Sequence, residues 1–342
     1  MKAALLSAWN SLSLTELDKP VPTGKQALIK VRYGGVCGSD ITVYRGLHMT
    51  ATVPRVLCHE ILGTIETLPE GYDGPFKAGE RVLMNPVISC GKCPACRSGR
   101  LNVCEKLELL GIHQNGGFEE YTVVNTEKLV HVPDELPDIV AVLGEPFAVG
   151  RHVCRRAGVS PKTRVLVIGA GTIGQVVAMN AKCLGARSVT VSEINPGRLA
   201  LAAKLELETI DPNAEDIRAR TAEITEGVGF DIVIDAAGAK ASLLQLPDLC
   251  RVGGTILSLG LSGSAVEFIL GKISFREQEI IGSRLYSQKD FEDGVAVLSE
   301  LARKLPIREM VSDIYPLTQI TEAFEKMMTG RNNGKIVIDV AK

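Results

Sequence analysis

The chain has 342 residues, which is long enough for two domains, and 45% of them are hydrophobic, which can supply a core for each. A formal net charge of −2 argues against nucleic acid or an anionic membrane as the main partner. No stretch approaches the roughly 18 apolar residues of a membrane span. Nine cysteines without a visible export signal favour a reducing cytoplasm.

The first part of the chain has the pattern of a mostly β domain. Up to about residue 145, Gly and Pro are frequent and the apolar stretches are short, such as residues 27–32 and 81–84. Short β-type runs between turn-forming residues are typical of strands joined by irregular loops. We therefore expect a mostly β domain at this end of the chain.

Four residues of metal-binding type are scattered through this part of the chain, namely Cys37, His59, Glu60 and Glu145. A catalytic zinc takes three protein ligands of mixed nitrogen, sulfur and oxygen type and keeps one position for water or substrate. Taken singly the four residues prove little. A lone Cys is most often a small buried hydrophobe, and a Glu before Pro is most often a loop acid or a helix start.

Four further cysteines, Cys90, Cys93, Cys96 and Cys104, lie close together in the sequence. This spacing folds one loop around a single tetrahedral metal. Four thiolates about 2.3 Å from Zn²⁺ leave no open position, so we expect a structural zinc. Disulfides are disfavoured without an export signal. An iron–sulfur cluster usually has a Pro after its fourth Cys, whereas Glu105 follows here. Scattered thiols are the remaining alternative.

From about residue 164 the pattern changes to apolar strands that alternate with helical segments. Strands are expected at residues 165–168, 188–192, 231–235 and 255–259, and helices from Thr172 and after Pro196. Alternation at this spacing predicts a parallel doubly wound sheet, so the fold class is α/β. After Gly282 the pattern is mixed and ends in a strand-like run at 335–340. That tail could return to the first domain.

Gly169, Gly171 and Gly174 form a GxGxxG turn between the strand at 165–168 and the helix that begins at Thr172. Gly169 allows the tight turn, Gly171 lets the backbone approach a pyrophosphate, and Gly174 lets the helix pack close to the sheet. The helix N-terminus then faces the phosphate with its unpaired N–H groups. Glycines in an ordinary strand–turn–helix connection are the alternative.

Glu193 directly follows the second strand of this region. A carboxylate there accepts hydrogen bonds from both ribose hydroxyls and repels a 2′-phosphate, which selects NAD over NADP. Arg198 either lies along the adenosine ribose or is a charge on the helix surface. Further cofactor contacts are expected at Thr172, Ile173, Ala236 and Gly260.

The order of these motifs is similar to that of the zinc-dependent medium-chain dehydrogenase/reductase family, and the similarity covers nearly the whole chain. It rests on Cys37-Gly-Ser-Asp, His59-Glu60, the four-cysteine loop, the run Gly116-Gly-Phe-Glu-Glu-Tyr, Glu145-Pro and the glycine-rich turn. Within the family, Glu145-Pro-Phe and residues 281–284 resemble the polyol and sugar-acid branch. That branch includes sorbitol, threonine and galactonate dehydrogenases and starvation-sensing dehydrogenase-like proteins.

The resemblance implies a GroES-like, mostly β catalytic domain over residues 1–148 and a Rossmann NAD-binding domain over 149–282. A C-terminal segment, residues 283–342, would return to the catalytic domain. Two zinc ions per chain are implied, one in the four-cysteine loop and a catalytic one held by Cys37 and His59. Glu60 and Glu145 would exchange as direct or water-bridged ligands, and Ser39 would be the first proton relay. Because relatives are commonly dimers or tetramers, a homodimer or homotetramer is expected.

Two positions depart from the usual pattern of the family. Cys58 stands where many relatives have Gly before the His-Glu pair, and it would either reshape the pocket or be a buried thiol. Thr42 stands where many relatives carry a His three residues after the relay Ser or Thr. A proton path would then have to use His48, His113 or a water chain beside Glu60.

The implied activity is oxidation of the secondary alcohol of a polyol or sugar acid (aldonate), with hydride passing to the nicotinamide ring. Zinc would lower the pKa of the substrate hydroxyl, and Ser39 would take the proton. The guanidinium of Arg284 would bind an aldonate carboxylate, or else contact the cofactor or form a structural pair. Glu119 and Glu120 could bind sugar hydroxyls, although only one of two neighbours on a strand faces inward.

Two alternatives come from other classes of protein. A non-enzymatic NAD-binding metabolite sensor of the same fold would explain Thr42 and Cys58. A decayed site, however, is not expected to keep every zinc ligand together with Ser39. A zinc-free quinone or enoyl reductase is disfavoured by the metal-type residues.

Overall fold

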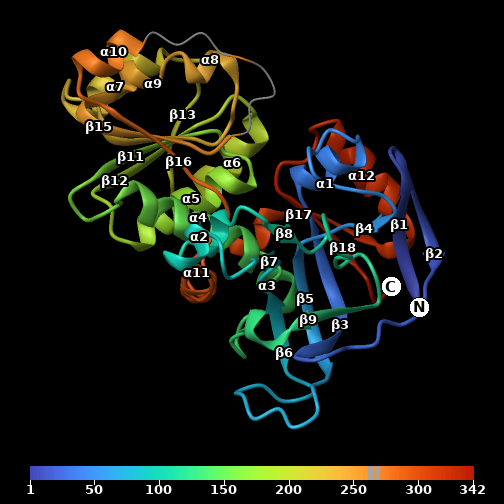
Figure 1. Cartoon of the computed structure of the whole chain (residues 1–342). Coiled ribbons are helices and arrows are strands. Elements are labelled where there is room, and N and C mark those ends of the chain that lie inside the picture. The colour runs from blue at the N-terminus through green and yellow to red at the C-terminus, as the bar shows by residue number, and fades with distance from the viewer. Residues whose placement is uncertain (261–264, 266–269) are drawn as a thin grey trace. The chain divides into compact units, whose positions relative to one another are not determined.

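The computed structural model of the chain describes residues 1–260, 265 and 270–342 (Figure 1). The chain folds into two compact units. Unit 1 contains Met1–Glu145, Ser287–Arg303 and Ile307–Lys342, and unit 2 contains Pro146–Tyr286 and Lys304–Pro306. The predicted fold class, a mostly β region followed by a parallel α/β region, is confirmed.

Unit 1 is built mainly from antiparallel strands. These are β1 (Lys2–Ala8), β2 (Ser11–Glu16), β3 (Gln26–Val36), β4 (Arg55–Val56), β5 (Glu60–Thr67), β6 (Arg81–Met84), β7 (Val87–Ile88), β8 (Glu108–Leu109), β9 (Tyr121–Asn125), β10 (Leu129–His131), β17 (Val311–Pro316) and β18 (Lys335–Asp339). The largest sheet has the order β10-β6-β5-β3-β18-β17, and β9 also pairs with β3. Smaller sheets contain β2-β1-β4 and β7-β8.

The helices of unit 1 are short except near the C-terminus. They are α1 (Gly38–Tyr44), α2 (Pro94–Arg97), α3 (Asp138–Ala141), α11 (Gln288–Ala302) and α12 (Ile320–Met328), with 3-10 turns η1 (Leu101–Val103), η2 (Thr126–Lys128), η3 (Ile307–Met310) and η4 (Leu317–Gln319). The helix α11 begins with a capping box. The hydroxyl of Ser287 accepts a hydrogen bond from the N–H of Asp290, and the Asp290 carboxylate accepts one from the N–H of Ser287.

The strand β3 is the centre of unit 1. It pairs antiparallel with β5, with β9 and with the C-terminal strand β18. All five residues of β18 are buried, which explains the apolar run of its three central residues, because a strand covered on both faces need not alternate. The chain end therefore completes a sheet that the N-terminal segments begin.

Unit 2 contains a single parallel sheet in the described residues. Its strands are β11 (Arg164–Ile168), β12 (Ser188–Ser192), β13 (Glu208–Ile210), β14 (Phe230–Asp235), β15 (Cys250–Ser258) and β16 (Glu279–Gly282). Their spatial order is β13-β12-β11-β14-β15-β16, which is the order of a dinucleotide-binding Rossmann sheet. The strand order reverses between β11 and β14, and a crevice at such a point is where these sheets bind ligands.

Helices connect the strands of unit 2 and cover both faces of the sheet. They are α4 (Gly144–Ala157), whose first residues belong to unit 1, α5 (Thr172–Cys183), α6 (Pro196–Lys204), α7 (Ile217–Thr225), α8 (Lys240–Leu243), α9 (Leu246–Leu249) and α10 (Leu270–Phe275). Figure 1 shows α5 and α6 on one face and α7 and α9 on the other. Among the helices in the described part of the chain, none has the length and apolar character of a membrane span.

One buried carboxyl in unit 1 lies outside every metal-type set. Glu119 is 2% exposed, while the neighbouring Glu120 is half-buried and accepts a hydrogen bond from the Lys2 N–H at 2.8 Å. Only one of the pair faces inward, as expected. Within the described residues, Oε2 of Glu119 has no hydrogen-bond partner. Burial raises the pKa of Glu119 to about 8.

The raised pKa of Glu119 predicts a pH-dependent loss of stability. Because the folded-state pKa lies above the unfolded one, the stability that protonated Glu119 contributes is complete below about pH 4.5 and is lost as pH rises through about 8. Glutamine does not ionise, so Glu119→Gln removes this loss of unfolding free energy. The loss amounts to about 1.4 kcal/mol for each tenfold difference in the acid dissociation constant between the folded and unfolded states. In denaturant unfolding, the free energy of unfolding of Glu119→Gln relative to that of the native protein should be higher at pH 9 than at pH 5. The pH 5 measurement is the internal control. An equal difference at both pH values would contradict this interpretation.

Candidate metal and dinucleotide sites

The ends of neighbouring strands bring three metal-type residues together. Cys37 follows the last residue of β3 and begins α1, and His59 immediately precedes Glu60, the first residue of β5. Because β3 and β5 pair with Gly35 opposite Glu60, these positions meet at one edge of the sheet. One ligand atom from each of Cys37, His59 and Glu60 lies within 4.8 Å of the other two.

Asp40 contacts the backbone and the imidazole of this three-residue cluster. Its carboxylate accepts hydrogen bonds from the backbone N–H groups of Cys37, at 2.8 Å, and Cys58, at 3.2 Å. The same carboxylate lies 3.7 Å from Nδ1 of His59. The other ring nitrogen, Nε2, lies 3.4 Å from the hydroxyl oxygen of Ser39. Asp40 is fully buried, so its carboxylate faces Nδ1 of His59 at ion-pair distance and fixes the backbone on both sides of the cluster by its two hydrogen bonds.

The electrostatics of the cluster are those of a cation site. Burial would lower the pKa of His59, but the charges of Cys37, Asp40 and Glu145 outweigh it and raise this pKa well above its usual value. In the described structure, Glu60 Oε2 and His59 Nδ1 are buried atoms without a hydrogen-bond partner. A thiolate, an imidazole and a carboxylate are a ligand set that suits zinc. The residues therefore fit a zinc ion.

Glu145 lies in the first turn of α4 and is 4% exposed. Its charge contributes to the raised pKa of both His59 and Lys335, so it faces the same cluster. Within the described residues, however, its carboxylate is not one of the three ligand atoms that lie within 4.8 Å of one another.

The four-cysteine loop folds on itself around the short helix α2, for which Cys93 is the N-cap. One sulfur atom from each of Cys90, Cys93, Cys96 and Cys104 lies within 4.8 Å of the others. The sulfur atoms of Cys90 and Cys96 are 4.0 Å apart, which is far longer than a disulfide bond of about 2.05 Å. All nine cysteines, each of them within the described residues, are free thiols.

The thiols of this loop differ in their readiness to ionise. Backbone N–H groups of Lys92 and Cys93 lower the pKa of Cys90 to about 6. Burial and the neighbouring thiols raise the pKa of Cys96 to about 12. Four thiolates this close together need a compensating cation, and a closed tetrahedral zinc supplies it.

The glycine-rich turn has the backbone that its sequence predicts. Gly169 has a φ of +95°, a conformation that residues with a side chain rarely adopt. A Cβ atom on Gly174 would lie 1.7 Å from the carbonyl oxygen of Gly169, so only glycine lets α5 start this close to β11. A Cβ atom on Gly171 would meet nothing within 4 Å among the described residues, which leaves that side of the turn open.

Glu193 closes the turn through backbone contacts. Its Oε2 accepts a hydrogen bond from the Ala170 N–H at 2.8 Å, and its Oε1 accepts from the N–H groups of Ile194 and Asn195 at 2.8 and 2.9 Å. Three of the roughly four acceptor positions of a carboxylate are thus in use, which leaves one for a ribose hydroxyl. Arg198 lies 3.9 Å from Oε2.

The other expected cofactor contacts, Arg284 included, all follow the carboxyl ends of strands in the parallel sheet. Thr172 and Ile173 open α5, Ala236 directly follows β14, and Gly260 lies two residues after β15. Arg284 is exposed and lies two residues after β16. A hollow of about 180 Å³ adjoins the turn and is lined by residues that include Gly169, Glu193, Ile194, Pro212, Ala237 and Ser242.

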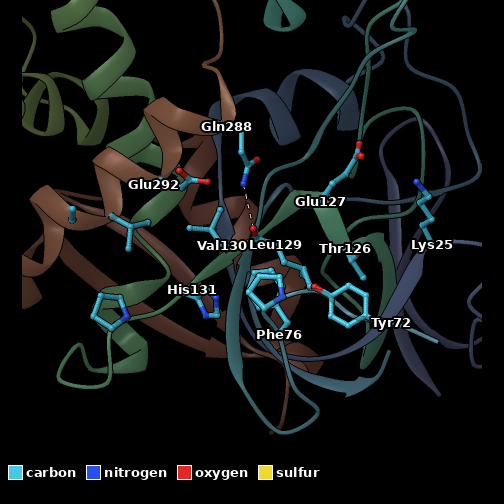
Figure 2. A pocket seen from close by; sticks show the side chains of 14 residues that line it. Lys25, Tyr72, Phe76, Thr126, Glu127, Leu129, Val130, His131, Gln288 and Glu292 are labelled. Atoms are coloured by element: carbon cyan, nitrogen blue, oxygen red, sulfur yellow. Dashed lines mark hydrogen bonds between the residues drawn. The ribbon is translucent and has the colours of Figure 1, made fainter. Parts of the chain in front are cut away.

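Unit 1 also contains a larger hollow, with a volume of about 590 Å³ (Figure 2). Figure 2 shows Phe76 and His131 side by side in it, and their rings stack with centroids 4.1 Å apart. Gln288 and Glu292 of α11 line another part of it. None of the candidate metal or cofactor residues named above is among the described residues that line this hollow.

Two family models match the chain. The model of the alcohol dehydrogenase GroES-like domain matches residues 23–134, and that of the zinc-binding dehydrogenase matches residues 172–300. The L-galactonate-5-dehydrogenase of Escherichia coli (strain K12) is 37% identical over 308 residues, which cover 90% of this chain and 89% of the relative. The chain belongs to the zinc-binding alcohol dehydrogenase family. It is accordingly an oxidoreductase, and the resemblance found in the sequence is confirmed.

Other relatives of this dehydrogenase extend over nearly the whole chain. The sorbitol dehydrogenase of Halalkalibacterium halodurans is 34% identical over 336 residues, 96% of this chain and 97% of the relative. A solved structure of an alcohol dehydrogenase from E. coli CFT073, in complex with the cofactor NADH, is 30% identical and has a TM-score of 0.89. Each of these two chains covers 99% of the other.

The structure places both residues that depart from the family pattern. Cys58 is fully buried, and its thiol donates to the carbonyl oxygens of Gly35 and Glu60. It is therefore a buried thiol, held at a φ of +88° that glycine adopts more easily. The Thr42 hydroxyl donates to the Gly38 carbonyl within α1.

Two residues of this dehydrogenase site were missed by the sequence analysis. Asp40 was visible only as part of the Cys-Gly-Ser-Asp run. Lys335 is the first residue of the buried strand β18, and its Nζ donates to Glu60 Oε1 at 2.5 Å. A lysine directly before the apolar run of residues 336–338 is the signal that could have found it, because lysine is almost never fully buried without a partner.

The four-cysteine loop leads to a prediction about stability. Cys96→Ser should lower the thermal midpoint by roughly 5–10 °C and remove about one zinc per chain, since metal binding here is part of folding. The matched control is Cys183→Ser, because Cys183 is a half-buried thiol of α5 outside both metal-type sets. Differential scanning fluorimetry and metal analysis check both variants. Full stability and zinc content in Cys96→Ser would show that the loop binds no metal.

Proposed function

We propose that the protein is an NAD-dependent zinc dehydrogenase that oxidises the secondary alcohol of a polyol or a sugar acid. The observation that carries this proposal is the cluster of Cys37, His59 and Glu60 beside the hydroxyl of Ser39. Two relatives whose names specify a sugar acid and a polyol as substrates support it.

The proposed metal content is two zinc ions per chain. Cys90, Cys93, Cys96 and Cys104 would hold a structural ion. Cys37 and His59, with Glu60 or Glu145, would hold a catalytic ion, which when bound supplies the Lewis acidity that lowers the pKa of a substrate hydroxyl. Ser39 would then relay the hydroxyl proton, accepting it while passing its own proton on toward solvent, because its oxygen lies 3.4 Å from Nε2 of the ligand His59 and so adjoins the ligand set.

The proposed cofactor is NAD, which would bind at the glycine-rich turn of unit 2. The N–H groups at the start of α5, from Thr172 and Ile173 onward, would face the pyrophosphate. Glu193 would accept a ribose hydroxyl at its one remaining acceptor position and repel a 2′-phosphate. The hollow beside Ile194 and Pro212 would take the adenine ring, since its lining is mostly apolar. Ala236 and Gly260 would contact the cofactor from the ends of β14 and β15.

The proposal extends to the substrate contact, the compartment and the oligomeric state. An aldonate carboxylate would pair with the exposed guanidinium of Arg284, unless that side chain contacts the cofactor or forms a structural pair. The protein would act in the cytoplasm, where the thiols of nine free cysteines stay reduced. It would be a homodimer or homotetramer, as is common among its relatives.

A substrate screen tests the proposed function. Protein loaded with zinc should form NADH, followed by absorbance at 340 nm, with at least one polyol or aldonic acid and not with primary alcohols of the same length. If a bound aldonate shields the guanidinium of Arg284 from water, Arg284→Ala should weaken transition-state binding by roughly 2 to 4 kcal/mol for aldonates and by far less for neutral polyols. Absence of turnover with every member of both classes, in protein that holds two zinc ions, would exclude the proposed substrates.

Cofactor choice gives a second test. The native protein should use NAD far better than NADP, and Glu193→Gln should narrow the ratio because it removes the negative charge while keeping the size of the side chain. Arg198→Ala is the matched control, since it removes the nearby cation and should widen the ratio. The ratio of kcat/KM values for the two cofactors is measured, with thermal stability recorded for both variants. Equal use of NAD and NADP by the native protein would contradict the role of Glu193.

A further inference from the structure

A further hollow of unit 1 is lined by two buried polar groups that the fold does not satisfy. Its volume is about 440 Å³, and its polar lining includes Asp18, Arg55, Asn115, Glu119 and Thr122. No candidate metal or cofactor residue is among the described residues that line it. The hollow therefore needs an explanation other than the dehydrogenase site.

Glu119 and Arg55 are the two unsatisfied groups. Oε2 of Glu119 and Nε of Arg55 are buried, and neither atom has a hydrogen-bond partner in the part of the chain that the structure describes. The guanidinium of Arg55 donates to the Thr52 hydroxyl at 3.2 Å but forms no ion pair within residues 1–260, 265 and 270–342. Because buried polar groups are nearly always hydrogen-bonded, the two atoms point to a partner that the protein does not supply.

The polar groups of this hollow are mainly hydrogen-bond donors. A guanidinium offers donors only. Oδ1 of Asn115 accepts a hydrogen bond from the Val56 N–H at 3.2 Å, which leaves the NH₂ end of this amide as a donor. Burial raises the pKa of Glu119 to about 8, so its carboxyl is mostly protonated at neutral pH and donates as well. A ligand for such a set is rich in acceptors, as an anion is.

The charges at the hollow limit the charge of that anion. Besides Arg55, the charged groups that line it are the exposed carboxylate of Asp18 and the α-amino group of Met1, which donates to the Leu17 carbonyl at 2.7 Å. The exposed Glu108 acts on Arg55 from outside the lining. One guanidinium fork binds one carboxylate through two parallel hydrogen bonds. A phosphate, with up to two negative charges, would leave more charge uncompensated.

The remaining lining is apolar and suits a hydrocarbon group. It includes Leu17, Pro20, Leu110 and Val123. Small-molecule sites combine such apolar walls with a few polar groups that fix the orientation of the ligand. The hollow therefore has a polar part for an anionic group and an apolar part for a short carbon chain.

We propose that this hollow binds a small organic monocarboxylate, whose charged end is held by Arg55, Asn115 and Glu119. The site is additional to the proposed dehydrogenase function and does not depend on it. Protonated Glu119 donates a charge-assisted hydrogen bond to the ligand, whereas ionised Glu119 repels it. Affinity is therefore complete below the pKa of Glu119 and is lost as pH rises through about 8.

The first test is a ligand-observed NMR titration of the full chain with hexanoate at pH 6.5. Hexanoate should saturate one site, and neutral hexanamide should bind on the order of tenfold more weakly. Arg55→Met should weaken hexanoate binding by roughly tenfold or more, because it removes the charged donor. Lack of saturation would mean that water alone fills the hollow, and it would overturn the proposal. Tighter binding of inorganic phosphate than of hexanoate would also overturn it.

The pH dependence tests the role of Glu119. Between pH 6.5 and pH 9.5 the affinity of the native protein for hexanoate should fall on the order of tenfold. In Glu119→Gln the fall should be several-fold smaller, because glutamine keeps a donor and does not ionise. Since α-amino groups also lose their proton at high pH, the comparison of the two proteins assigns the effect. An equal fall in both would show that Glu119 does not contact the ligand.

Two control variants locate the site. Lys25→Met removes a cation that lines the larger hollow of Figure 2, and it should leave hexanoate affinity unchanged. Cys37→Ser removes a candidate metal ligand and should also leave the affinity unchanged. A loss of binding in either control that equals the loss in Arg55→Met would place hexanoate elsewhere and refute the proposal.

A second variant at position 55 covers the case in which Arg55→Met does not fold. Arg55→Lys keeps the positive charge but lacks the planar fork that binds a carboxylate through two hydrogen bonds. It should bind hexanoate several-fold more weakly than the native protein, with folding checked by circular dichroism. Native affinity in folded Arg55→Lys would contradict the proposed contact. Because no step is an assay of turnover, these outcomes are independent of the substrate screen.

Discussion

The metal-type cluster depends on the pairing of β3 with β5 on one side and β18 on the other. Cys37 follows β3, Glu60 begins β5 and Lys335 begins β18, so all three lie at one edge of the same sheet. A slip of one residue in either pairing would turn these side chains to the opposite face. Gly35 is part of the same constraint, because a Cβ atom there would lie 2.0 Å from Oε2 of Glu60.

The two metal-type sets differ in how their geometry is fixed. The four cysteines lie on one short loop whose own backbone N–H groups contact the sulfur atoms, so the loop is held by local interactions. The open cluster instead depends on charged groups outside the ligand set. The Asp40 carboxylate lies near Nδ1 of His59, and the Lys335 ammonium group donates a hydrogen bond to Glu60. A closed tetrahedral site is complete with its four ligands, whereas the side chains of an open site depend on neighbouring groups for their orientation.

Unit 2 shows a different solution to holding a buried charge. Glu193 is 6% exposed, and backbone N–H groups of Ala170, Ile194 and Asn195 satisfy most of its acceptor positions. Most of the hydrogen-bonding capacity of this carboxylate therefore stabilises the turn, and a smaller part is left for a bound ligand. Its two roles are compatible because the backbone donors come from loops at the carboxyl ends of β11 and β12, where a dinucleotide binds in this fold.

The sequence by itself determined the features that depend on short stretches of chain. The glycine-rich turn, the four-cysteine loop and the strands β11, β12, β14 and β15 are local patterns, and the structure has each of them close to where the spacing predicts. The short strand β13 was not predicted. Alternation also predicted that only one of Glu119 and Glu120 faces inward, but it did not predict which one. That depends on burial, which only the folded chain defines.

Only the tertiary structure decided which charged groups meet. Asp40 contacts the backbone of Cys58 across 18 positions, and Lys335 contacts Glu60 across 275. No local periodicity encodes such separations, because the contacts arise from strand pairing and from the return of the C-terminal tail to β3. The sequence thus specified the ligand types and the α/β fold class, and the long-range pairing of β3 decided how the charges of the candidate metal site are balanced.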